Sequence, residues 1–219
     1  MIRVAIVDDH DLVRAGVRAI LEQDPLFQVV GETGDGQDAI RLVTKLRPDV
    51  VLMDVHLPGG IGGLDATETI VKDCPEVKVI ILTQYENREY IRRALRIGAR
   101  GYLLKRSVAA QLKEAIKTVH AGQRYLHPSI ADELVDLVMN GRSIEDAEDD
   151  YDRLTPREKQ VFKLLAEGKT SRDISKYLTI SLKTAMTHRT NIMEKLKMHS
   201  RSELIRYAVR KAIILVEDV

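Results

Sequence analysis

The chain has 219 residues, of which 44% are hydrophobic and 31% charged, and its formal net charge is +1. This length suits two small domains, and the apolar content is enough to bury a core, which excludes a disordered polymer. The single cysteine, Cys74, excludes an internal disulfide and a cysteine-based zinc site, as expected in a reducing compartment. No apolar stretch is long enough for a signal peptide or a bilayer span, so we expect a cytoplasmic protein without a membrane partner.

The first 120 residues alternate short apolar runs with segments of helical periodicity. The runs are rich in β-branched residues, and three of them are continuously apolar, which is typical of parallel strands covered on both faces. Such β-α repeats predict an α/β domain with a five-stranded, doubly wound parallel sheet, and any site at the carboxyl ends of its strands. The predicted strands are residues 3–8, 28–32, 49–54, 77–83 and 101–105.

The pattern changes between residues 123 and 152. The stretch "PSIADELVDLVMN" predicts a helix at about 128–140, which begins at Pro128 and ends before Gly141. The following "GRSIEDAEDDYD" holds six acidic residues and one arginine, as expected of a solvated linker. We therefore expect one domain at 1–122, a linker at 123–152 and a second domain at 153–219.

The second domain is predicted to be all-α, because its helix start signals are unusually explicit. Four helices are expected, and the short connections between them favour a helix-turn-helix module. The start signals are a capping box "TPRE" at 155–158, "TSRD" at 170–173, Ser181, and a second capping box "SRSE" at 200–203.

Charge divides unevenly between the two parts of the chain. Residues 151–219 hold 15 Lys and Arg against 8 Asp and Glu, whereas residues 1–150 hold 19 against 25. A basic domain beside an acidic one suggests that the basic part binds a polyanion. The alternative is a solvated basic face that has no partner.

Polar side chains follow the predicted strands. Asp8 and Asp9 follow the first strand, Asp54 ends the third, Thr83 ends the fourth and Lys105 ends the fifth. Because parallel strand ends share one edge, the three carboxylates should converge and repel one another, and a bound Mg²⁺ would relieve this repulsion. A carboxylate beside the metal can attack phosphorus, while Lys105 and Thr83 bind phosphoryl oxygens. Taken singly, each residue could instead be an ordinary helix cap or strand end.

The motifs "VAIVDDH", "VVLMDVHLPGG", "VIILT" and "GYLLK" together resemble the receiver domain of two-component response regulators, over residues 2 to about 122. The resemblance implies a flavodoxin-like fold in which a sensor histidine kinase phosphorylates Asp54. It implies a Mg²⁺ site and a phosphoryl-binding switch, and it leaves in doubt the loop "LPGGIGGLD", which is one residue longer than in most relatives. The implied metal ligands are Asp8, Asp9, Asp54 and the backbone carbonyl of His56, and the switch residues are Thr83, Lys105 and Tyr102.

Residues 154–208, from "LTPREKQ" to "SELIRYA", resemble the LuxR-type helix-turn-helix of NarL/FixJ response regulators. The resemblance implies that the third helix, 182–196, enters the major groove of promoter DNA and that the protein binds DNA as a homodimer. Met186 stands where relatives usually carry lysine, so we expect it to contact thymine methyl groups, the alternative being a buried core methionine. The expected DNA contacts are Lys183, Thr184, Met186, Thr187, His188, Arg189, Thr190 and Asn191, and the expected dimer contacts are Ile205, Val209, Ala212 and Ile213.

The resemblances imply a transcription regulator whose phosphorylation at Asp54 switches dimerisation and DNA binding. It is expected to accept a phosphoryl group and to lose it slowly, and not to act as an enzyme. One alternative is a regulator that binds DNA without phosphorylation. The other is an aspartyl-phosphate phosphatase, which is disfavoured because His56 stands where such enzymes carry their second aspartate.

Overall fold

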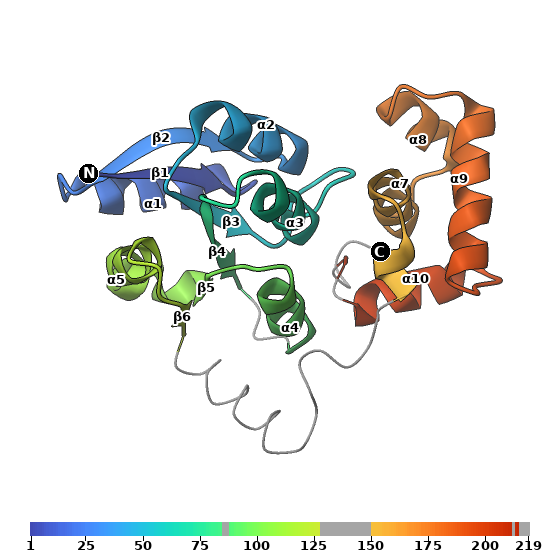
Figure 1. Cartoon of the computed structure of the whole chain (residues 1–219). Coiled ribbons are helices and arrows are strands. Elements are labelled where there is room, and N and C mark those ends of the chain that lie inside the picture. The colour runs from blue at the N-terminus through green and yellow to red at the C-terminus, as the bar shows by residue number, and fades with distance from the viewer. Residues whose placement is uncertain (85–87, 128–149, 212, 215–219) are drawn as a thin grey trace, which may run out of the picture. The chain divides into compact units, whose positions relative to one another are not determined.

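The computed structural model describes residues 1–84, 88–127, 150–211 and 213–214. The helix expected at about 128–140 and most of the acidic linker lie outside these residues. The chain divides into two compact units, an N-terminal α/β unit and a C-terminal helical unit (Figure 1). Two units agree with the expected organisation, and the domain boundaries at residues 122 and 152 remain a proposal.

The N-terminal unit contains a parallel sheet with the strand order β2-β1-β3-β4-β5-β6. The first five strands follow the flavodoxin-like order, which confirms the predicted fold class. The sixth strand was not predicted, because its two residues are too short to show a periodicity. The strands are β1 (Ile2–Val7), β2 (Phe27–Thr33), β3 (Val50–Asp54), β4 (Lys78–Thr83), β5 (Gly101–Leu104) and β6 (Tyr125–Leu126).

Helices cover both faces of this sheet, which is why its central strands are apolar throughout. On one face, side chains such as Ile6, Leu52 and Leu82 pack with Leu112 and Ile116 in a continuous core. This face is covered by α1 (Asp11–Glu22) and α5 (Val108–His120), which follows the short 3₁₀ helix η1 (Lys105–Ser107). The opposite face is covered by α2 (Gly36–Leu46), α3 (Gly63–Asp73) and α4 (Arg88–Arg96) (Figure 1).

The C-terminal unit has the four predicted helices, preceded by a short 3₁₀ helix. Phe162 lies at the centre of its core, where Tyr151 and Tyr207 meet its ring edge-on with ring centroids 5.4 and 6.0 Å away. Leu204 and Ala208 are buried in the same core. The elements are η2 (Asp150–Arg153), α7 (Pro156–Ala166), α8 (Ser171–Tyr177), α9 (Leu182–Lys195) and α10 (Arg201–Arg210).

Three of the four helix starts are capped as predicted. Thr155 and Glu158 form a reciprocal capping box at α7, Thr170 does the same with Asp173 at α8, and Ser181 caps α9. At α10 the Ser200 hydroxyl accepts from the backbone N–H of Glu203, but the Glu203 carboxylate accepts from His199 N at 2.8 Å. The second capping box therefore closes one residue earlier than the sequence suggested. Each cap satisfies backbone donors that a helix start would otherwise leave unpaired.

The helices of both units are short. Within the described ranges, none combines the length and the apolar character that crossing a lipid bilayer requires.

Candidate functional site

Asp54 lies at the carboxyl end of β3 with its side chain almost entirely buried. The Lys105 ammonium, which follows β5, lies 2.7 Å from Asp54 Oδ2 and 2.7 Å from Asp8 Oδ2. Asp8 is completely buried and follows β1, which pairs with β3. The parallel sheet thus brings residues that are far apart in sequence to one edge, and a single ammonium bridges two buried carboxylates.

Burial shapes the ionisation of this pair. Burial raises the pKa of Asp54 to about 6, although the Lys105 ammonium acts in the opposite direction; the neighbouring Asp8 carboxylate adds to the rise. For Lys105, burial alone would lower the pKa, but the Asp54 and Asp8 carboxylates outweigh it and the pKa lies above its ordinary value. The lysine therefore remains a cation beside the buried aspartates.

The pocket can hold a hard divalent cation. Asp8, Asp9, His10 and Asp54 each bring one ligand atom within 4.8 Å of the others. The cluster has three carboxylates and one lysine ammonium, which pairs with Asp8 and Asp54, so the pocket keeps a net negative charge. Oxygen ligands and excess negative charge suit Mg²⁺, which also keeps several of its waters. The donor set fits the expected ion.

The backbone at the start of α3 packs closely against the backbone of Asp54. A Cβ atom on Gly63, the first residue of α3, would lie 1.7 Å from the carbonyl oxygen of Asp54, so glycine alone fits there. The Gly63 N–H donates to the carbonyl of Val55 at 3.0 Å. The loop "LPGGIGGLD" therefore leads into α3, whose first turn lies directly against the backbone of Asp54.

Of the remaining predicted pocket residues, Thr83 and Tyr102 are buried in the same unit and His56 is half-buried. Thr83 ends β4 and Tyr102 lies on β5, and both side chains are fully buried. The His56 N–H lies 3.4 Å from Asp54 Oδ1, and the His56 ring meets the buried Tyr90 ring of α4 edge-on at 5.1 Å. His56 thus connects the segment after Asp54 to α4.

In the C-terminal unit, α9 presents the predicted contact residues outward. Ala185 and Ile192 of α9, and Leu196 just beyond its end, are buried. Met186 is 56% exposed, which excludes the core alternative for this residue. The exposed candidates are Lys183, Thr184, Met186, Thr187, Arg189 and Thr190, while His188 and Asn191 are half-buried.

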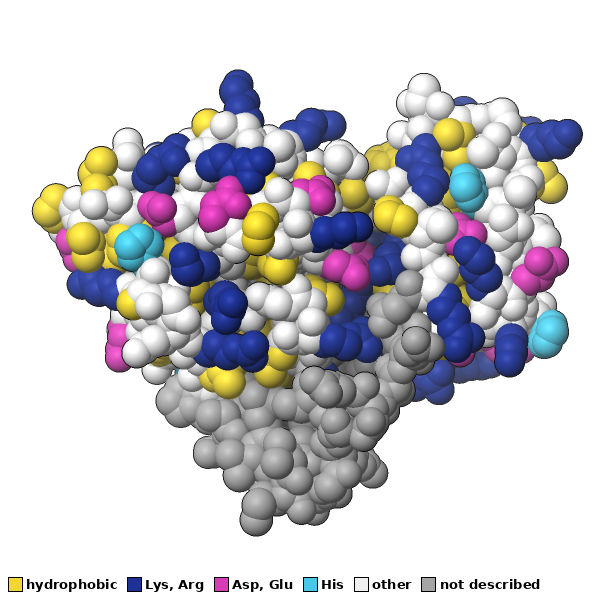
Figure 2. Space-filling view, in the orientation of Figure 1, with side chains coloured by type: hydrophobic (Ala, Val, Ile, Leu, Met, Phe, Trp, Pro, Cys, Tyr) yellow, Lys and Arg dark blue, Asp and Glu magenta, His cyan; other side chains and the backbone are white. Residues whose placement is uncertain are grey.

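Two threonine hydroxyl groups on this face of α9 donate hydrogen bonds to backbone carbonyls of the same helix. Thr187 Oγ1 donates to the Lys183 carbonyl at 3.0 Å, and Thr190 Oγ1 donates to the Met186 carbonyl at 3.2 Å. On the face of the C-terminal unit visible in Figure 2, Lys and Arg side chains are more prominent than Asp and Glu. An exposed basic surface with apolar groups from Met186 and threonine suits a nucleic-acid groove.

The expected dimer residues fall into three groups. Ile205 and Val209 are half-buried on α10 and line an open groove of about 790 Å³ with Tyr207. Ile213 differs from the prediction: α10 ends at Arg210, and Ile213 turns back into the core of the unit, where it is 6% exposed. Ala212 lies outside the described residues.

Comparison with known proteins identifies both units. Residues 4–117 match the response regulator receiver domain, and residues 152–208 match the bacterial regulatory proteins of the luxR family. The chain is 37% identical over 214 residues to the oxygen regulatory protein NreC of Staphylococcus carnosus, covering 97% of this chain and 99% of that protein.

The chain belongs to the LuxR-type response regulators. Solved structures agree: RcsB of Salmonella enterica serovar Typhimurium, bound to a promoter in the presence of the phosphomimetic BeF3−, has 29% identity and a TM-score of 0.58. That match covers 94% of this chain and 97% of RcsB. A LuxR-family response regulator from Aurantimonas sp. SI85-9A1 has 37% identity and a TM-score of 0.60, covering 64% of this chain and 99% of the other.

In this response regulator the acidic cluster lies where receiver domains typically bind Mg²⁺. Two of its features escaped sequence reasoning. His10 Nδ1 lies 2.7 Å from Asp9 Oδ1 and 3.2 Å from Asp8 Oδ1. The sequence signal for this residue was that it directly follows the two aspartates. The sequence held no signal for Gly63 beyond the glycine-rich loop, because the close approach of this residue to Asp54 depends on the tertiary structure.

Proposed function

We propose that this response regulator is switched by phosphorylation of Asp54 by a sensor histidine kinase. The observation that carries the proposal is the buried Asp54 carboxylate, 2.7 Å from the Lys105 ammonium in a pocket shared with Asp8 and Asp9. An Asp54 carboxylate oxygen forms a bond to phosphorus while the bond between phosphorus and the donor's leaving group breaks. The leaving group keeps the electron pair of the broken bond.

The residues of the pocket have separate tasks. Asp8, Asp9, Asp54 and the His56 carbonyl would hold Mg²⁺, which supplies positive charge against the phosphoryl oxygens when it is bound. Lys105 pairs with a phosphoryl oxygen in place of the Asp54 carboxylate it now contacts. Thr83 donates a hydrogen bond to another phosphoryl oxygen, and Tyr102 follows the movement of Thr83. Slow hydrolysis of the acyl phosphate returns the protein to its first state.

Phosphorylation of Asp54 alters dimerisation and DNA binding by the C-terminal unit. Phosphorylation replaces the single negative charge of the Asp54 carboxylate with the nearly two charges of an acyl phosphate, which favours a second arrangement of the receiver. A nearly complete shift between two states requires about 5.5 kcal/mol of differential stabilisation, which a few charge-assisted hydrogen bonds can supply. In the active state two chains bind promoter DNA as a homodimer through Ile205 and Val209 of α10, and α9 enters the major groove.

The proposal is tested by incubating the full chain with acetyl phosphate and Mg²⁺ and locating the added phosphoryl group by mass spectrometry. We expect one group on Asp54, and none on an Asp54→Asn variant. Asp11→Asn is the matched control, because Asp11 is an exposed carboxylate at the start of α1 and its loss should leave phosphorylation intact. Phosphorylation of Asp54→Asn to the same extent would contradict the proposal.

A further inference from the structure

Strand β6 lies at one edge of the parallel sheet, shortly before the segment that joins the two units. It consists of Tyr125 and Leu126 and pairs in parallel with β5. Both side chains are half-buried, and Tyr125 packs on the margin of the core. A strand this short, with so little buried surface, belongs to the least stable parts of a fold, so single contacts decide whether it stays on the sheet.

His127 directly follows β6 and adds two such contacts. Its backbone N–H donates to the Tyr102 carbonyl of β5 at 3.1 Å. Its ring Nε2 lies 3.0 Å from the Ser107 hydroxyl, and the two groups share a hydrogen bond whose donor depends on the tautomer of the ring. Because Pro128 follows, His127 is restricted to extended conformations, which suits its pairing with β5. The two contacts lie on either side of Lys105 in the sequence.

Ser107 occupies the N-cap position of α5 without capping the helix. A serine at this position usually has an extended backbone and accepts a hydrogen bond from the first helical turn. Here its side chain makes no capping bond, and its backbone is helical, with φ −101° and ψ 0°, because η1 ends at this residue. The hydroxyl therefore has two alternative partners, which are the His127 ring in the present backbone conformation and the start of α5 in an extended one.

The η1 turn connects this contact to the phosphoryl pocket. It begins at Lys105, whose ammonium lies 2.7 Å from Asp54 Oδ2, and it ends at Ser107. In the proposed function, Lys105 exchanges the Asp54 carboxylate for a phosphoryl oxygen. The contact between Ser107 and His127 thus belongs to the arrangement in which Lys105 still pairs with the unmodified aspartate.

We propose that His127 is a positioning residue that holds the η1 turn, and Lys105 with it, in the unphosphorylated arrangement. When Lys105 moves to the phosphoryl group, Ser107 exchanges the His127 ring for the start of α5. Strand β6 then loses one of the contacts that keep it on the sheet, and its release lengthens the connection to the DNA-binding unit. The proposal rests on the proposed function and names the residue through which phosphorylation reaches the second unit.

The expected effect of removing this contact is a gain in affinity. A contact made only in the unphosphorylated arrangement weakens every ligand that needs the other arrangement, in proportion to the population it holds back. One hydrogen bond corresponds to about threefold to tenfold. His127→Ala should therefore bind beryllofluoride with Mg²⁺ more tightly by this factor, and should bind promoter DNA more tightly by a similar factor without beryllofluoride. At saturating beryllofluoride its DNA affinity should equal that of the wild type.

Three variants show whether the hydrogen bond is responsible. His127→Gln carries an amide nitrogen near the position of Nε2 and should behave like the wild type. In a Ser107→Ala background, His127→Ala should have no further effect, because the hydrogen bond is already absent. His120→Ala is the matched control, since His120 is an exposed histidine at the end of α5, and both affinities should stay unchanged.

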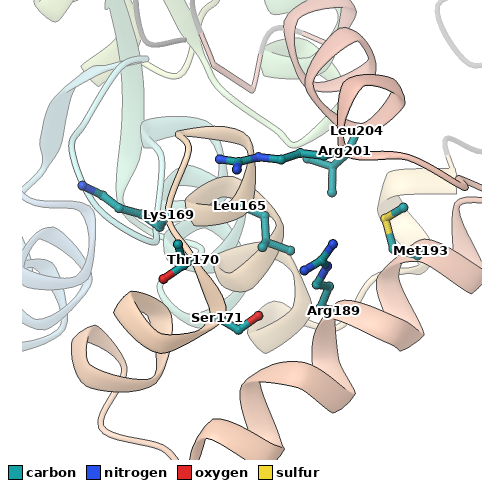
Figure 3. Close-up of a pocket in the computed structure, with 8 residues that line it drawn as sticks. All are labelled: Leu165, Lys169, Thr170, Ser171, Arg189, Met193, Arg201 and Leu204. Carbon is teal, nitrogen blue, oxygen red and sulfur yellow. The ribbon is translucent and has the colours of Figure 1, made fainter.

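A fourth variant shows how a change at the DNA surface itself would differ. Arg189 of α9 is exposed, and its guanidinium points into a pocket of about 130 Å³ that Leu165 and Arg201 also line (Figure 3). Because Arg189 is one of the expected DNA contacts, Arg189→Gln should weaken DNA binding equally with and without beryllofluoride. Its affinity for beryllofluoride should not change. The same pattern in His127→Ala would contradict the proposal.

Thermal unfolding of each variant completes the test. Tighter binding of both ligands by a variant that unfolds near the wild-type temperature supports the proposal, and His127→Leu, which fills the space of the ring, gives the same comparison if alanine prevents folding. Unchanged or weaker binding of both ligands would overturn it, and so would tighter binding of beryllofluoride alone. A wild type whose DNA affinity does not respond to beryllofluoride would instead overturn the proposed function.

Discussion

The pocket at Asp54 and the exposed face of α9 hold their functional side chains in opposite ways. Asp54 and Asp8 are buried at strand ends, share one ammonium, and have the backbone of Gly63 pressed against them. On α9, Met186 is 56% exposed and is free of such constraints. A change in the pocket should therefore alter stability and chemistry together, in either direction for stability, whereas a change on the helix face should alter recognition alone.

The largest effect should come from Gly63→Ala. The added methyl group would overlap the carbonyl of Asp54, so we expect a loss of about 3 kcal/mol or more of stability and impaired phosphorylation. Chemical denaturation of the full chain measures the loss. Gly16→Ala is the control: a Cβ at Gly16 meets nothing within 4 Å on α1, so this change should stabilise by about 0.5–1 kcal/mol. Equal effects of the two changes would remove the proposed constraint on Asp54.

Asp8→Asn tests the carboxylate repulsion and the Mg²⁺ binding of the pocket through stability, and needs no phosphorylation. Without metal, this variant should be at least as stable as the wild type, because one of three mutually repelling carboxylates is gone. Mg²⁺ at one hundred times its dissociation constant should stabilise the wild type by about 2.7 kcal/mol and the variant much less. Thermal unfolding with and without MgCl2 gives both numbers. A variant stabilised by Mg²⁺ as strongly as the wild type would exclude Asp8 as a ligand.

Glu158 provides a comparison within the C-terminal unit, because it supports the fold there and lies outside the contact face of α9. Burial alone would raise its pKa, but Lys195 and the Thr155 backbone N–H and hydroxyl outweigh it and hold the pKa below its ordinary value. A depressed carboxyl pKa stabilises the fold above the unfolded value of about 4.3 and loses this effect as pH falls through the folded pKa.

Glu158→Gln should therefore destabilise the protein by about 1 kcal/mol at neutral pH. The difference from the wild type should begin to shrink near the unfolded value of about 4.3 and vanish once the pH is below the folded pKa of Glu158. Denaturation midpoints across this pH range measure it. Glu194→Gln, on the exposed part of α9, should differ little from the wild type at any pH. A deficit for Glu158→Gln that persists in acid would mean that packing, and not the charge, is responsible.

The smallest effect concerns Met186. If it packs against a thymine methyl group, replacing thymine by uracil at the contacted position should weaken binding of the wild type by about 1 kcal/mol or less. The same replacement should not affect Met186→Ala, because the contact is already lost. Binding measurements on the paired duplexes complete this cycle. An equal uracil effect on both proteins would rule out the contact.

The features that could be predicted were those governed by local periodicity and capping. Asp54 and Thr83 end β3 and β4 as predicted, because a continuous apolar run can only be buried and must stop where the chain leaves the sheet. The caps at Thr155 and Ser181 were visible because they depend on neighbouring residues.

What could not be predicted depends on contacts between distant segments. Ile213 continues the four-residue spacing of the half-buried Ile205 and Val209 of α10, yet the chain leaves the helix after Arg210 and buries it. The approach of Gly63 to Asp54 requires the packed structure. Two residues were also too few for a pattern to reveal β6.

The central claim is that the state of the buried Asp54 controls an exposed DNA-binding face. Its most direct test is the affinity of the full chain for promoter DNA with and without beryllofluoride and Mg²⁺, in the wild type and in Asp54→Asn. The account predicts tighter binding for the wild type upon addition and no change for the variant. Equal affinity in all four measurements would show that DNA binding is independent of Asp54 and would contradict the account.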